Sequence, residues 1–557
     1  MTKNKLTLKI VLTVMIGTLI TAGAYYLLLP PINVHSMGFW AFLLIPTACY
    51  ALPFLFEKGE DDGTRKKGKV KYNGVNVYLP KPSGKVRKLP IAIVLIPVAV
   101  LILGGILSSE MFNAQKYANV ITVTEAQFDE DMKETNEVTN IALMDSESAQ
   151  IFGNRTLGKL SDVVSQYEIG DRRYTQINYG GKPKKVANLE YAGFFKWAIN
   201  REKGVPGYVI VDPVLNDGEY IKLDTPLKYV DSAYFNDNLM RKLRFEYPTK
   251  IFDFVSFEIN EEGKPYYIVS CVSPNAGLFG AMDVNEVIIF DPCNGESVLY
   301  DLAKVPDWVD AVFSGDLAEE KYNWHGMLSG GYINSIIGNV GCKQTTDDYG
   351  YIVIGDDVWY FTGVTSVTND ASNIGFIISN ARTGEYKYYP VVGAEEYSAM
   401  KSAEGKVQNM GYNASFPSLI NVSGQATYIM VLKDDGGYVK LYALVNVENV
   451  GLVATGSTQS EAMVAYKDLL IEKGVVQKEE PAPIPEEEKL KAEFKIEAIR
   501  DVVIDGNTYL YITGDDGYTY KCKVADFESA VLLSVGDTVK VEYELTENEK
   551  IRSVVKY

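Results

Sequence analysis

The sequence predicts an α+β protein in three parts: N-terminal transmembrane helices, tandem antiparallel α+β modules outside the membrane, and a small C-terminal OB- or SH3-like β-barrel. Three observations predict this architecture. Three long uncharged runs lie within the first 110 of 557 residues, a glycine–aromatic–strand pattern recurs through the middle, and about five short strands follow an acidic, proline-rich segment. With 47% hydrophobic and 23% charged residues, the composition is that of a folded chain.

Residues 1–110 are predicted to form a membrane domain with three transmembrane helices at 10–29, 37–56 and 89–109. At 1.5 Å per residue, runs of this length cross a hydrocarbon core of about 30 Å. The first run is longer than the apolar core of a typical signal peptide, and two prolines follow it. We therefore expect a retained span there, and the lipid bilayer as a partner of this domain.

The orientation is predicted from Lys and Arg in the short loops. Three lysines precede the first span and ten Lys or Arg residues lie in the loop at 57–88, whereas the loop at 30–36 has no Lys or Arg. We expect the N-terminus and the basic loop to be cytoplasmic and the C-terminal part to be extracytoplasmic, in a multi-pass protein of the cell membrane. Residues 111–557 carry a net charge of −26, which disfavours nucleic acid as a partner because phosphate binding requires basic patches, and we expect none.

The extracytoplasmic part is divided by its patterns. Residues 111–200 are predicted to be a stalk, with a helix over 124–140, followed by a first mixed segment. Residues 201–360 and 361–474 are predicted to be α+β modules of a tandem repeat, because a glycine, three variable residues, an aromatic residue and a β-rich run recur. The three copies begin at Gly204, Gly263 and Gly424.

Two helices in this region have start signals. Pro306 suits the first turn of a helix over 307–312. Thr458 and Glu461 form a capping-box pattern, and apolar residues at helical spacing follow them. We expect these helices to cover one face of the sheets.

The C-terminal part begins with a predicted Pro/Glu-rich linker at 475–493, which is typical of stiff, solvated chain. Residues 494–557 then read as a small β-barrel with strands at 494–504, 508–513, 519–524, 538–544 and 551–557. Such barrels bind many kinds of ligand or none, so this prediction of fold does not decide function.

Signatures of catalysis are missing from the sequence. It holds no GxGxxG, GxSxG or HExxH motif, and we expect no cofactor. The only histidines are His35 and His325, which excludes a zinc site built from three histidines. No catalytic residue or metal ligand can be named, although acid–base catalysis by two carboxylates stays open among 67 acids.

Four residues form the candidate binding site: Trp308, Tyr322, Trp324 and His325 lie within eighteen residues. Tyr and Trp suit sugar stacking and protein interfaces, but they suit a packed core equally well. A second candidate feature is a disulfide, because Cys271 and Cys293 flank one hairpin-like stretch; two free thiols are the alternative.

A resemblance accompanies these patterns. The segments at 141–145 (IALMD), 191–196 (YAGFFK) and 443–445 (ALV) resemble a family of uncharacterised bacterial membrane proteins with similar N-terminal spans, some loosely labelled as cell-shape-related. The pattern at 263–269 and 294–296 resembles the PepSY-like module of secreted bacterial proteins. The first resemblance implies anchorage but no mechanism. The second implies binding or inhibition of a partner protein.

Two classes of function follow. The first is a non-enzymatic, membrane-anchored protein of the bacterial cell envelope, a scaffold that binds an envelope protein or assembles with itself. The second is a cell-envelope enzyme or PepSY-like protease regulator that acts on wall polymer or peptide. The missing catalytic signatures favour the first, whereas a cleft with two close carboxylates, one with a raised pKa, would favour the second.

Overall fold

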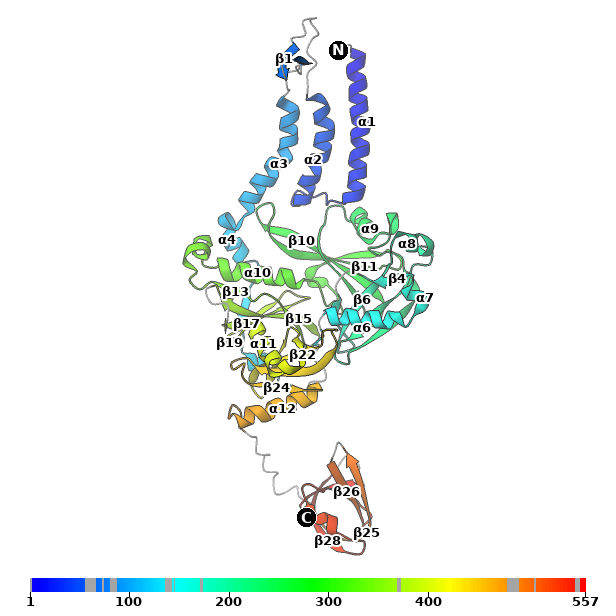
Figure 1. The fold of residues 1–557 in the computed structure, drawn as a ribbon, viewed down its shortest axis with the longest axis vertical. Helices are drawn as coiled ribbons and strands as arrows, with labels where there is room; N and C mark the ends of the chain where they lie inside the picture. Colours follow the sequence, from blue (N-terminus) through cyan, green and yellow to red (C-terminus); the bar gives the residue numbers. More distant parts are fainter. Residues whose placement is uncertain are drawn as a thin grey trace. The chain divides into compact units, whose positions relative to one another are not determined.

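The computed structural model describes residues 3–55, 67–72, 75–80, 88–135, 143–144, 146–170, 174–367, 372–477, 490–504, 507–545 and 551–556. The chain divides into two compact units, Met1–Lys473 and Gly474–Tyr557 (Figure 1). Most of the predicted linker at 475–493 and most of the basic loop at 57–88 lie outside the described residues. Within that loop, β1 (Lys67–Tyr72) pairs with β2 (Val75–Pro80).

Three helices near the N-terminus are long and apolar enough to span a membrane: α1 (Lys3–Leu28), α2 (Met37–Ala51, extended by a 3₁₀ turn to Phe54) and α3 (Lys88–Ser108). Few of their residues are buried inside the protein, as expected for helices that face lipid. At Gly17 of α1, a side chain would collide with the ring of Tyr50, whose hydroxyl lies 2.9 Å from the Thr18 hydroxyl. Glycine therefore permits the close approach of α1 and α2.

The ends of these helices are hydrogen-bonded to the globular part. The Ser108 hydroxyl, at the end of α3, accepts from the amides of Leu278 and Phe279 at 2.7 and 3.0 Å. Arg244 of α9 (Leu239–Glu246) donates to the Leu29 carbonyl at 2.9 Å, just beyond α1. Because Ser108 and Arg244 are both buried, these contacts hold the spans and the globular part together as one unit.

Most strands between Tyr167 and Gly456 belong to four antiparallel groups. The first holds β4 (Tyr167–Ile169), β5 (Thr175–Tyr179), β6 (Lys182–Tyr191), β7 (Val205–Asp212) and β8 (Asp217–Leu227). The second holds β9 (Ile251–Ile259), β10 (Pro265–Ala276), β11 (Gly280–Phe290) and β12 (Ser297–Asp301). The third holds β13 (Lys343–Thr345), β14 (Gly350–Ile354), β15 (Asp357–Ser366), β17 (Gly375–Asn380) and β18 (Tyr386–Tyr389). The fourth holds β20 (Asn413–Ala414), β21 (Ser418–Val422), β22 (Gln425–Lys433), β23 (Val439–Asn446) and β24 (Val453–Gly456).

Strand pairing crosses the boundaries that the sequence suggests. The predicted boundary at residue 200 falls between β6 and β7, which pair in one sheet. In the segment 124–140, the structure has β3 (Val123–Glu125) and the single turn α5 (Phe128–Asp131) where one helix was expected; residues 136–142 lie outside the described part. β3 pairs in parallel with β18, so the start of the globular part adds a strand to a sheet whose other strands lie much later in the sequence.

Helices pack against these sheets: α6 (Ser146–Gly158), α8 (Phe194–Asn200), α10 (Gly315–Leu328), α11 (Glu396–Lys406) and α12 (Gln459–Glu472). The capping box predicted for α12 is confirmed, since the Thr458 hydroxyl accepts from the Glu461 amide and the Glu461 carboxylate accepts from the Ser457 amide. The helix predicted over 307–312 does not form, and α10 starts three residues later.

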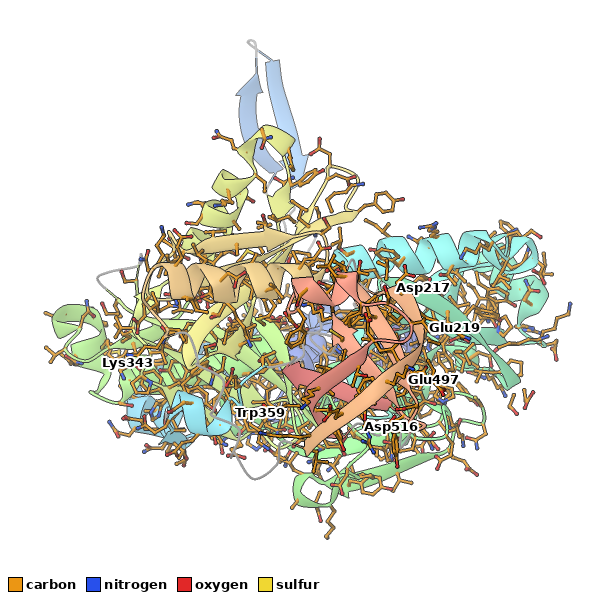
Figure 2. The ribbon with its side chains drawn as sticks, turned by 90° about the horizontal axis from the view of Figure 1, so that it is seen from below. Asp217, Glu219, Lys343, Trp359, Glu497 and Asp516 are labelled. Carbon is orange, nitrogen blue, oxygen red and sulfur yellow. The ribbon has the colours of Figure 1, made fainter. Side chains whose placement is uncertain are left out.

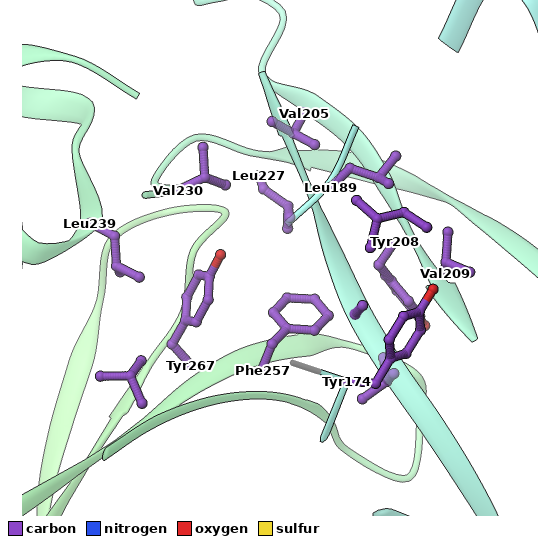
Figure 3. Packing of buried hydrophobic residues seen from close by; sticks show 14 of the residues in the cluster. Tyr174, Leu189, Val205, Tyr208, Val209, Leu227, Val230, Leu239, Phe257 and Tyr267 are labelled. Carbon is purple, nitrogen blue, oxygen red and sulfur yellow. The ribbon is translucent and has the colours of Figure 1, made fainter. Parts of the chain in front are cut away.

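The largest core joins the first two sheets, and Figure 3 shows part of it. The ring of Phe257 lies between Tyr208 and Tyr267, with centroid distances of 5.9 and 5.4 Å. The Tyr208 hydroxyl donates to the Gly263 carbonyl at 2.7 Å, which satisfies its polar end inside the apolar cluster. Tyrosine therefore serves here as a core residue.

The edge strand β8 is protected by charge. Along it, Asp217 and Glu219 are exposed and alternate with less exposed residues. Figure 2 labels both side chains. Charged side chains on an edge strand oppose pairing with another chain.

The second unit contains β25 (Leu490–Ile504), β26 (Asn507–Gly514), β27 (Thr519–Lys523), β28 (Thr538–Leu545) and β29 (Ile551–Lys556), close to the five predicted strands. They pair in the closed order β25-β26-β27-β29-β28, with β27 and β29 parallel. Inside, Phe494 stacks on Tyr520 at 4.0 Å. Arg552 lies over the ring of Tyr518 at 3.3 Å and donates to the Tyr543 hydroxyl at 2.7 Å.

Candidate functional site

Two adjoining cavities, of about 490 and 480 Å³, lie where the first three sheets meet α10. They share Asp316 and Glu320, and Asp253 of β9 lines the first of them. We refer to both together as the acidic cleft.

Tyrosines form one wall of the acidic cleft. Tyr349, Tyr351 and Tyr360 contact one another with centroid distances of 5.3 to 5.9 Å. The Tyr349 hydroxyl donates to Asp316 at 3.3 Å. The Tyr349 ring reaches this position because residue 315 is glycine, where any Cβ would collide with it.

Acidic residues on α10 form the opposite wall. The Ser314 hydroxyl caps the helix by accepting from the Leu317 amide at 3.2 Å. Asp316, Glu319 and Glu320 follow at spacings that place them on one face. Lys321 is buried behind this face, 2.5 Å from Asp283 and over the ring of Phe313. Its charge therefore pairs with Asp283 and does not neutralise the carboxylates of the cleft.

The carboxylates of the cleft raise one another's pKa values. Burial raises the pKa of Glu319 to about 7, and the charge of Asp348 adds to this. Burial and then the charge of Asp253 raise the pKa of Glu320. The pKa of Asp253 is raised by burial and then by Asp316. A cleft with this mutual repulsion favours a cationic group, which would relieve it.

A second acidic pair lies deeper and is closed to solvent. Glu258 is 0% exposed and accepts from the backbone amides of Asp310 and Ala311 at 2.8 and 3.0 Å. Burial raises the pKa of both Glu258 and Asp310, and their mutual repulsion adds to the shift for Asp310. Because a substrate cannot reach these oxygens, we assign the pair to holding β9 against the 310–311 loop.

The structure places the four predicted binding residues in different surroundings. Trp324 lines the acidic cleft and meets Tyr117 edge-on at 5.0 Å. His325 bonds through Nδ1 to the Ala118 carbonyl at 2.9 Å, and Tyr322 is buried in the core of the third sheet. Trp308 packs on Tyr266 in a separate cluster. Only Trp324 of the four therefore belongs to the cleft.

The disulfide suggested for Cys271 and Cys293 does not form, and both thiols are free. Cys271 faces Glu286 in the register of β10 with β11, whereas Cys293 lies beyond the end of β11, seven residues further along this chain. The stretch of β11 from Glu286 to Phe290 lies between the two cysteines and alone covers about 13 Å at about 3.3 Å per residue, beyond the reach of a disulfide. Burial raises the pKa of each thiol to about 12.

Sequence reasoning did not find the acidic cleft. The spacing of Asp316, Glu319 and Glu320 after the capping Ser314 was the available signal, but Asp253 and Tyr349 join them only through the fold. Among the residues that the structure describes, no group of three or more His, Cys, Asp or Glu side chains could hold a metal ion.

Comparison with known proteins adds little to this picture. No protein-family model matches the chain, and no curated protein matches it at a significant level. Among solved structures, it is similar to the Bacillus megaterium YpeB C-terminal domain, at 14% identity over 36% of this chain and 92% of that one, with a TM-score of 0.09. A second similar structure is an ACO/RPE65 chimera, at 9% identity over 70% of this chain and 64% of that one, with a TM-score of 0.12.

Proposed function

We propose that this chain is a non-enzymatic, membrane-anchored protein of the bacterial cell envelope, and that its extracytoplasmic part binds a basic segment of a partner protein in the acidic cleft. The observation that carries the proposal is the meeting of Asp253, Asp316 and Glu320 with a wall of tyrosines in one cavity. Carboxylates pair with Lys and Arg, and aromatic faces attract the same cations. The orientation follows from the basic loop at 57–88.

Two finer assignments belong to this proposal. Assembly with a protein partner agrees with the PepSY-like pattern at 263–269. An OB-like C-terminal barrel is supported by the strand order of the second unit and by the parallel pairing of β27 with β29.

The test compares two double variants in full-length protein, by cross-linked pulldown from native membranes. Asp316→Asn with Glu320→Gln removes two charges from the cleft. Asp217→Asn with Glu219→Gln removes two charges from the edge of β8 and is the matched control. We expect partner recovery to fall about tenfold with the cleft variant and to stay unchanged with the control. Equal recovery from both variants would refute the proposal.

One observation favours the second candidate function, an envelope enzyme or a protease regulator. The raised pKa values of Asp253 and Glu320 suit an acid–base pair, and both side chains line the same cavity. Asp253→Asn would then abolish hydrolysis of wall polymer or peptide by the full-length protein while partner recovery stays unchanged. Hydrolysis unaffected by Asp253→Asn would remove the enzyme from this candidate.

A further inference from the structure

Two apolar surfaces of the globular part lie open. The first, here named the aromatic ridge, comes from α8, α9 and the chain before α9. Its exposed members are Phe194, Phe195, Ile199, Phe235 and Phe245. The second, here named the aliphatic loop, is residues 329–342, which contain no charged residue. Its exposed members are Ile333, Ile336, Ile337 and Val340. Exposed groups of this kind mark interaction sites, and single exposed apolar residues do not.

Ring contacts place the aromatic ridge at the level of the first span. Phe245 lies 6.1 Å from Tyr25 and 6.3 Å from Tyr26, both in the last turn of the span Thr7–Leu28. Arg241 lies over the ring of Tyr26 at 4.2 Å and donates to the Phe235 carbonyl at 2.6 Å. Figure 1 shows α9 next to the end of α1, with α8 further out from it. Phe235 and Phe245 therefore lie at the depth where a span leaves the hydrocarbon.

The ridge continues outward from these two residues to α8. Trp197 contacts Phe235 at 5.7 Å, and Phe194 contacts Tyr234 at 5.0 Å. Beyond them, Phe195 is 78% and Ile199 is 73% exposed. The surface is thus continuous with the surface that α1 presents to lipid.

The aliphatic loop is attached to the end of the third span. Gln115 of α4 (Glu110–Ala118) donates to the Ser329 carbonyl, and α4 starts two residues after α3 ends. Tyr332 packs on the same small cluster as Ala114, which follows the end of α3 at Ser108 by six residues. The Asn334 side chain closes the loop by bonding both backbone groups of Val340, at 3.0 and 3.1 Å. This brace leaves Ile337 and Val340, 78% and 79% exposed, pointing away from the core.

We propose that the aromatic ridge and the aliphatic loop insert into the lipid surface of the leaflet on the side of the globular part. The occupant is lipid, because the spans beside the aromatic ridge and the aliphatic loop place the surface of the bilayer at the depth of both. Aromatic residues favour the boundary between headgroups and acyl chains, and Arg241 is placed to reach headgroups from there. Lys196 on α8, and Arg201 and Lys203 in the turn that follows it, suit anionic headgroups. The proposal does not depend on the partner of the acidic cleft.

Lipid contact is measured on full-length protein in nanodiscs that hold one copy each. An environment-sensitive fluorophore is attached at Phe195→Cys or Ile337→Cys, in protein whose partly exposed Cys49 and Cys293 are replaced by Ser. The control site is Leu215→Cys, in the turn between β7 and β8, which is 75% exposed. Lipids brominated near the headgroup quench a fluorophore that contacts them. Unchanged thermal midpoints show that each variant is folded.

We expect at least threefold stronger quenching at residues 195 and 337 than at residue 215. Quenching no stronger than at residue 215 would overturn the proposal. So would a fluorophore that is shielded only when several copies share a vesicle, because a second copy of the chain would then be the occupant. Labels at Ile199 and Ile336 repeat the measurement if either first variant misfolds.

Discussion

Replacing Glu396 with glutamine should remove a pH-dependent loss of stability from the globular part. Glu396 starts α11, is 0% exposed and accepts from the Thr346 hydroxyl at 3.1 Å. Burial raises its pKa from 4.5 to about 7. The folded state therefore holds the proton that the unfolded chain releases, and stability declines as pH rises from about 4.5 to 7. One pKa unit corresponds to about 1.4 kcal/mol, so keeping this carboxylate ionised at pH 8 costs the folded state about 3 kcal/mol.

The assay is thermal unfolding of full-length protein in detergent, followed by tryptophan fluorescence. Trp359 reports on this region because it belongs to the same core cluster as α11. About 2.5 kcal/mol of this loss falls between pH 5 and pH 8, so at roughly 2 °C per kcal/mol for a domain of this size the midpoint of wild type should fall about 5 °C further over that interval than that of Glu396→Gln. The control is Glu448→Gln, which replaces an exposed carboxylate between β23 and β24; its midpoint should fall by as many degrees as that of wild type. If Glu396→Gln and wild type lose the same number of degrees, this carboxylate is not the cause.

Three further predictions concern the ends of the molecule and its membrane contact. Limited proteolysis should cut within 475–493 and release a folded barrel. In that fragment, urea unfolding should show that Arg552→Ala lowers the unfolding free energy by about 2 kcal/mol. Lys491→Ala should change it by less than about 0.5 kcal/mol. Arg244→Ala should raise amide exchange at 29–36 about tenfold, because it removes the bond that holds the end of α1; unchanged exchange would show that the contact is dispensable. Protease added outside intact cells should digest the globular part and spare the loop at 57–88, and cleavage in that loop would reverse the orientation.

Local chemistry explains why some predictions agree with the structure. Continuous hydrophobic runs predict the three spans, and short β-rich runs between Gly- and Asp-containing turns predict the strands of the barrel. The capping box before α12 uses only neighbouring residues: the Thr458 hydroxyl accepts from the Glu461 amide as the pattern predicts, and the Glu461 carboxylate accepts from the amide of Ser457, one residue before the cap. In each case the information lies within one window of sequence.

Contacts between distant residues explain the rest. The helix predicted over 307–312 does not form because the amides that would bond back to the carbonyls of its first turn are used elsewhere: the Ala311 amide donates to the buried Glu258 carboxylate and the Val312 amide to the Ala381 carbonyl. The cleft brings Asp253 together with Tyr349, nearly a hundred residues later, which no local pattern records. The residues from Trp308 to His325 are close in sequence, yet only Trp324 lines the cleft, because aromatic residues serve a core and a surface equally well and only tertiary packing separates the two uses.

The pairing of β3 with β18 sets an order of events during synthesis. The segment around Asp131 leaves the third span first, yet its partners Lys387 and Tyr389 follow 256 and 258 residues later. At about 5–20 residues per second, that segment waits roughly 15–50 s for its partners. Phe128 and Met132, buried in the finished protein, have no place in its core during that interval. The first strand of the globular part therefore has no partner until β18 emerges, and the nascent chain depends at least that long on whatever shields those side chains.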